Sequence, residues 1–179
     1  MRRNRFRIAL GLGAVAVAAA TALTVISFAS AGDPRSLTSV ATQATARFHD
    51  FDQAKAAGWD VLVKDKNNIA CIDNQPVGGM GVHYANASIL FDGDINADQP
   101  EALVYAPNAA GHLKLAALEY IVFQSAWNGA DPPELFGQQF ALTPDGNRFG
   151  IPAFWSLHVW IWQPNPSGLL QPWNPRVHC

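Results

Sequence analysis

The sequence predicts an α+β fold in which an N-terminal helix packs on a mostly antiparallel sheet. Two observations support this class. Residues 39–58 place apolar side chains at helical spacing, and residues 59–162 hold a series of short strand-like runs separated by Gly, Pro and Asn. Consecutive strands with no helix between them pair mostly antiparallel. The pattern leaves open whether the sheet stays flat or curls into a small barrel.

The helical segment is expected over Ser39–Gly58. Asp50 can cap a second short turn, so the helix is expected to break near His49 and Asp50. Gly58 is a suitable stop, because glycine adopts the left-handed conformation that ends many helices. The apolar residues that define the pattern are Val40, Ala41, Ala44, Phe48 and Phe51.

Strands are expected wherever β-branched, aromatic and other apolar residues lie between turn residues. The candidates are Trp59–Val63, Val82–Tyr84, Ser88–Phe91, Ala102–Tyr105, Leu113–Gln124 and Phe154–Trp162. The longest, Leu113–Gln124, is expected to be central. After residue 162, four prolines exclude a helix or a central strand, so the C-terminus should be an ordered Pro-rich coil packed by Leu169, Leu170 and Trp173.

The first 31 residues have the pattern of a secretory signal peptide. A basic start is followed by an apolar run over residues 8–28 and by Ala29-Ser30-Ala31. The run of about 21 residues is also long enough for a retained membrane anchor, and Arg2-Arg3 admits twin-arginine export. We expect a signal peptide at 1–31, a linker at 32–38 and a single compact domain at 39–179. The protein should be secreted or lie on the exterior of the cell envelope, and it should contact a membrane only if the N-terminal segment is retained.

Charge and cysteine content narrow the function further. The chain has 12 Lys+Arg and 14 Asp+Glu; loss of the four arginines of the signal leaves 8 and 14, a net charge of −6. This balance argues against a nucleic-acid partner, which requires a basic surface. The two cysteines, Cys71 and Cys179, predict one intrachain disulfide in an exported protein. The oligomeric state is not indicated.

Three ionisable residues stand within the strand-like runs and form the candidate site. Alternation places Glu119 on one face with Leu113, Leu115, Ala117, Ile121 and Phe123, and His158 on one face with Phe154, Ser156, Trp160 and Trp162. His83 follows Gly79 and Gly81, which allow a close backbone approach. Ionisable groups among apolar neighbours are costly unless they are paired. Two imidazoles and one carboxylate predict a metal site for Zn, Cu, Fe or Mn, or a pocket for a small ligand.

Two other interpretations compete with a metal site at His83, Glu119 and His158. The three groups can be a hydrogen-bonded packing network in a structural or interaction protein of the cell envelope. They can also form a metal-free acid–base pair in an enzyme. The sequence does not decide whether the protein is an enzyme, because no nucleophile motif accompanies these residues.

Two further patterns are weaker. Asp92-Gly93-Asp94-Ile95-Asn96-Ala97-Asp98 is similar to the first half of a calcium loop, but Ala97 and Leu103 stand where that loop needs Gly and Glu, so an acidic surface turn is expected. Trp155, Trp160, Trp162 and Trp173 would form a carbohydrate or apolar-ligand platform if exposed, and burial of most of them is expected.

Five segments together resemble a family of small exported bacterial proteins without an established activity. They are G-M-G-x-H-Y at 79–84, P-E-A-L-V-Y at 100–105, L-x-A-L-E-Y at 115–120, L-F-G-Q at 135–138 and L-H-V-W-x-W-x-x-N-P-x-G at 157–168. The resemblance covers about residues 40–179. It implies one exported domain and supplies no catalytic residue.

Overall fold

The helical segment begins earlier than the sequence pattern indicated. The computed structural model describes residues 33–179, and the expected signal peptide lies outside them. Helix α1 spans Pro34–Thr45, a 3₁₀ turn spans Ala46–His49, and α2 spans Phe51–Ala56. The linker expected at 32–38 is therefore wrong from Pro34 onward. Asp33 caps α1 by accepting a hydrogen bond from the backbone N–H of Arg35, and proline at the first helical position favours the start.

The predicted break in the helical segment is confirmed. Asp50 separates the 3₁₀ turn from α2, and its carboxylate accepts a hydrogen bond from the backbone N–H of Asp52 at 3.0 Å. Gly58 ends the segment with a φ of 100°. Among residues 33–179, none of the helices has the length and apolar character needed to cross a bilayer.

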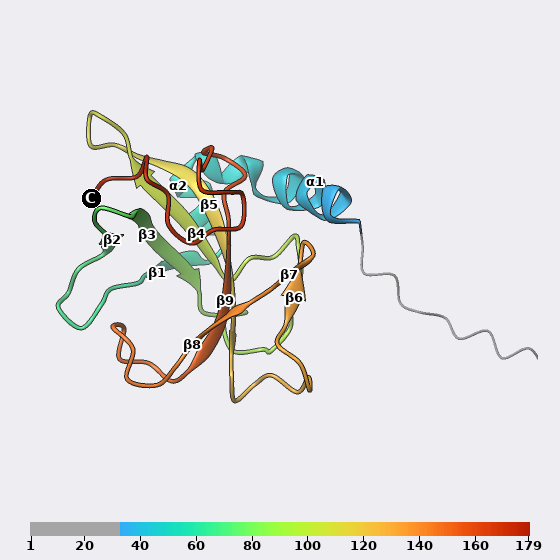
Figure 1. The fold of residues 1–179 in the computed structure, drawn as a ribbon. Helices are drawn as coiled ribbons and strands as arrows, with labels where there is room; N and C mark the ends of the chain where they lie inside the picture. The colour runs from blue at the N-terminus through green and yellow to red at the C-terminus, as the bar shows by residue number, and fades with distance from the viewer. Residues whose placement is uncertain (1–32) are drawn as a thin grey trace, which may run out of the picture. The chain divides into compact units, whose positions relative to one another are not determined.

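A seven-stranded antiparallel sheet forms the body of the fold (Figure 1). Its strands are β1 (Trp59–Leu62), β2 (Cys71–Asn74), β3 (Gly78–Asn86), β4 (Ala102–Pro107), β5 (Leu113–Phe123), β8 (Ala141–Thr143) and β9 (Phe154–Val159). Their order is β1-β3-β4-β5-β9-β8, with β2 also paired to β3. A short hairpin, β6 (Glu134–Leu135) and β7 (Gln138–Gln139), lies outside this sheet. In the described residues β1 and β8 are not paired to each other, so the sheet does not close into a barrel.

One expected strand is absent and the other five differ in extent, most of all β3, which is expected at Val82–Tyr84 and spans Gly78–Asn86. Ser88–Phe91 forms turns because Asn86 redirects the chain: its side-chain Oδ1 accepts hydrogen bonds from both the N–H and the hydroxyl of Ser88. The last strand ends at Val159 instead of Trp162. The first candidate ends at Leu62. Strands β2 and β8 were not expected from the sequence.

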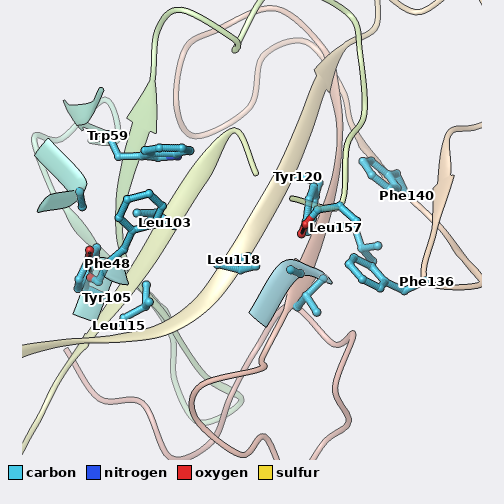
Figure 2. Packing of buried hydrophobic residues seen from close by; sticks show 14 residues of the cluster. Phe48, Trp59, Leu103, Tyr105, Leu115, Leu118, Tyr120, Phe136, Phe140 and Leu157 are labelled. Atoms are coloured by element: carbon cyan, nitrogen blue, oxygen red, sulfur yellow. Dashed lines mark hydrogen bonds between the residues drawn. The ribbon is translucent and has the colours of Figure 1, made fainter. Parts of the chain in front are cut away.

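The sheet has two differently used faces. The helices cover one face, here called the helix face, where Phe48 packs with side chains of β4, β5 and β9; Figure 2 shows this cluster. The labelled members from these strands are Leu103, Tyr105, Leu115, Leu118, Tyr120 and Leu157. The Tyr105 hydroxyl also donates a hydrogen bond to the carbonyl of Phe48 at 2.7 Å. The opposite face, here called the site face, carries Glu119.

A β-bulge changes which residues share the face of Glu119. Tyr105 pairs with Leu115 whereas Val104 pairs with Ala117, so Ala116 is an extra residue in β5. Leu115 consequently joins the helix face, and its predicted place beside Glu119 is wrong. Strict alternation holds only beyond the bulge, from Ala117 to Phe123.

The C-terminal coil is ordered, although its anchors differ from those expected. Asn174 is fully buried and exchanges two backbone hydrogen bonds with Gly79 of β3, and Val177 is also buried. Leu169, expected to pack, is exposed. The predicted disulfide between Cys71 and Cys179 is confirmed, with Cα atoms 5.6 Å apart, and it holds the chain end beside β2 and β3 (Figure 1).

Candidate metal centre

His83, Glu119 and His158 come together from three strands on the site face. Glu119 of β5 lies directly opposite His158 of β9 on one side and Ala102 of β4 on the other. His83 of β3 is separated from β5 by β4, a backbone distance of roughly 10 Å at about 4.8 Å per strand spacing. His83 pairs with Val104 of β4, so its imidazole crosses β4 obliquely and reaches Glu119 past the small side chain of Ala102.

The three side chains lie within metal-ligand distance of one another. Nε2 of His83 lies 3.0 Å from Nε2 of His158 and 3.3 Å from Oε2 of Glu119. Nδ1 of His158 lies 3.3 Å from Oε1 of Glu119. One ligand atom from each residue can be chosen so that all three lie within 4.8 Å of one another. In residues 33–179 this is the one group of three or more His, Cys, Asp or Glu side chains with such geometry.

Burial determines the charge state of the group. All three residues are less than 10% exposed, and desolvation disfavours a charge on each. Burial lowers the pKa of His83 to about 4 and that of His158 well below its usual range, and it raises the pKa of Glu119 to about 8. Burial therefore favours the neutral form of all three groups at neutral pH, and the contact between the two Nε2 atoms is a hydrogen bond.

The hydrogen bonding of the group is incomplete. Nδ1 of His83 is buried and has no hydrogen-bond partner in the described residues. The backbone of Gly81 raises the pKa of His83, against the larger effect of burial. It does not form a hydrogen bond of acceptable geometry with Nδ1. A buried polar atom left unpaired costs about 1–3 kcal/mol. This cost falls on Nδ1 whatever partner Nε2 has, because the two nitrogens lie on different edges of the ring.

A small apolar pocket opens beside His83 and Glu119. Its volume is about 100 Å³. His158 does not line it; this ring lies behind the site, stacked 6.0 Å from Trp160. The apolar wall consists mainly of Met80, Ile121, Phe123, Phe149, Ile151 and Phe154. A molecule that reaches His83 and Glu119 through this pocket therefore passes mainly apolar side chains.

The sequence reasoning missed a second buried carboxylate, Glu101. This residue is 2% exposed, and its Oε2 accepts a hydrogen bond from the backbone N–H of Ile121 at 2.7 Å. Strand β4 begins at Ala102, so the N–H of Ile121 has no backbone partner before it and Glu101 supplies one. Burial raises the pKa of Glu101 to about 8. The sequence feature that could have revealed Glu101 is its position directly before the apolar run Ala102–Tyr105.

The weaker sequence patterns do not form sites. In the calcium-like segment, the carboxylate of Asp92 accepts a hydrogen bond from the N–H of Asp94, as in an ordinary acidic turn. Trp160 is buried, and the other three tryptophans of the suggested platform are half-buried, so they form no exposed aromatic surface. Of the three remaining histidines, His49 packs edge-on against Trp162, whereas His112 and His178 are exposed.

Comparison of the chain with protein-family models, curated proteins and solved structures found no match.

Proposed function

We propose that this protein is an exported metal-binding protein and that His83, Glu119 and His158 are the ligands. The observation that carries the proposal is the convergence of these three buried side chains within ligand distance. The ions that accept two imidazoles and one carboxylate are Zn, Cu, Fe and Mn.

Two of the three separations between ligand atoms match the edges of a coordination polyhedron. Two ligand atoms about 2.0–2.1 Å from one ion, at an angle of 90–109°, lie about 2.9–3.4 Å apart. The separations of His83 Nε2 from His158 Nε2 and from Glu119 Oε2 are 3.0 and 3.3 Å. Nδ1 of His158 then donates to Oε1 of Glu119, in the manner of histidine ligands that donate their second N–H to a carboxylate.

The burial of three ionisable groups at one point favours a metal site over a packing network. A network that existed only to fill the core would gain from replacing the trio by apolar side chains. A metal ion gives the three groups a common partner and compensates for their burial. Three protein ligands also leave coordination positions open, as a catalytic or ligand-binding metal requires.

Export is the second part of the proposal. It is supported by the disulfide between Cys71 and Cys179, since such bonds persist in oxidising compartments. The signal-like pattern of residues 1–31 and the resemblance to exported proteins point the same way.

Elemental analysis after equilibrium dialysis tests the metal site. Oxidised protein is dialysed against Zn²⁺, Cu²⁺, Fe²⁺ or Mn²⁺, and the bound metal is counted per chain. We expect one ion per wild-type chain, and a loss of affinity of at least about a hundredfold in His83→Ala and His158→Ala, since even outer partners of a site are worth 10–100-fold.

The matched control is His112→Ala, which removes an exposed imidazole far from the site and should bind as wild type. Circular dichroism verifies that each variant is folded. Folded wild-type protein that takes up none of the four ions would overturn the proposal and leave the packing network as the explanation.

A further inference from the structure

The pocket beside the candidate metal centre indicates which class of molecule binds there. We propose that it holds one small monoanion with an apolar body, its anionic head on the metal at His83 and Glu119 and its body among the aromatic and aliphatic side chains. This inference depends on the proposed metal site, and it adds the ligand class.

The charge of the loaded site calls for a single negative charge. A divalent ion bound by two neutral imidazoles and one carboxylate carries a net charge of +1. The surroundings are apolar, and a buried net charge is costly unless it is compensated. A monoanionic donor in the open position neutralises the site, whereas a neutral donor leaves the charge and a dianion reverses it.

The lining of the pocket excludes strongly polar ligands. It contains no Lys or Arg, and apart from His83 and Glu119 its polar side chains are the hydroxyls of Thr143 and Ser156. A phosphorylated ligand would lack the cationic partners that it needs. A sugar would find too few hydrogen-bond partners for its hydroxyls. A short alkyl group meets none of these costs.

The volume limits the size of the apolar body. The pocket of about 100 Å³ is smaller than an apolar cavity of about 150 Å³ that admits benzene. About three or four carbons fit within it, and longer chains would extend toward solvent.

The outer wall of the pocket is held in place before any ligand arrives. It is formed by Phe149 and Ile151 in the segment between β8 and β9. Nη2 of Arg148 contacts Oδ2 of Asp65 at 3.0 Å, and the carbonyl of Arg148 accepts a hydrogen bond from the N–H of Lys66 at 3.0 Å. These contacts join the segment to the turn after β1, so the pocket exists without a closing movement.

The binding of carboxylates of increasing chain length tests the proposed ligand class directly. The full chain is loaded with one equivalent of Co²⁺, whose visible spectrum reports a donor entering its open position, and is titrated with acetate, propionate, butyrate, pentanoate and hexanoate. We expect affinity to rise about fourfold per methylene, the effect of burying one such group, up to butyrate or pentanoate, and to level off beyond. Metal-free protein should bind at least about tenfold more weakly.

Variants of the wall separate the pocket from the metal. Phe149→Ala and Ile151→Ala should keep Co²⁺ and acetate binding but reduce the gain per methylene to about twofold. Leu142→Ala, at an exposed position outside the pocket, is the matched control and should keep the fourfold gain.

Each outcome decides a different proposal. If Co²⁺ binds at the three ligands but affinity is the same for acetate and hexanoate, or the gain persists in both wall variants, the ligand class is wrong and the metal site stands. If neither Co²⁺ nor any of the ions tested above binds, the proposed function fails and the ligand class with it.

Discussion

The raised pKa of Glu119 makes metal binding a proton exchange. A carboxylate must lose its proton to become a ligand, and burial raises the pKa of Glu119 to about 8 in the metal-free protein. The histidines do not compete at neutral pH, because burial lowers the pKa of His83 to about 4 and that of His158 well below its usual range. One proton should therefore leave for each ion that binds.

The size of this effect follows from the titration of one group. With a pKa of about 8, Glu119 is half ionised at pH 8 and about 1% ionised at pH 6, so metal affinity should fall about fiftyfold across that interval. Binding should release about 0.9 proton per ion at pH 7 and about 0.5 at pH 8. A carboxyl and two imidazoles with ordinary pKa values would release about 0.1 proton or less at pH 8.

Isothermal titration calorimetry in buffers of different ionisation enthalpy counts these protons. Glu119→Gln is the control: it should bind metal more weakly and lose the dependence on pH between 6 and 8. Wild-type protein that binds metal at pH 8 without releasing a proton, or a Glu119→Gln variant that releases as many as wild type, would refute the reasoning.

Three further predictions concern the stability of the metal-free protein, each measured by urea unfolding. Tyr105→Phe removes the hydrogen bond to the carbonyl of Phe48 and should cost about 1–2 kcal/mol; an unchanged midpoint would contradict this. Joint replacement of Cys71 and Cys179 by Ser opens a loop of 108 residues and should cost up to about 4–5 kcal/mol; a loss below about 1 kcal/mol would show that the bridge only tethers the end. The folded-state pKa of Glu101 is raised to about 8, so stability should fall as pH rises from about 4.5 to 8, and Glu101→Gln should make the fall shallower; a slope identical to wild type would contradict it.

Side-chain alternation predicted part of the site from the sequence. It placed Glu119 and His158 within apolar rows of two strands, and both are buried on the site face. It could not predict that His83 reaches the same point, because that depends on the order of β3, β4 and β5 and on their register. Only the register shows that the small side chain of Ala102 lies next to Glu119, where it leaves room above β4.

The errors have local physical causes. The extra residue at Ala116 moved Leu115 to the helix face, and a bulge is not visible in a pattern of apolar residues. Asn86 ended β3 with side-chain hydrogen bonds where the following apolar residues suggested another strand. Asp33 and Pro34 form a helix start, but the residues after them are mostly polar and do not show the apolar spacing on which the predicted helix rests.

The most direct measurement is the position of a bound ion. Crystals of the metal-loaded protein, measured on both sides of the absorption edge of the metal, should show one anomalous peak about 2.0–2.2 Å from Nε2 of His83, from Nε2 of His158 and from a carboxylate oxygen of Glu119. A peak only at exposed histidines such as His112, or no peak in fully loaded crystals, would contradict the account.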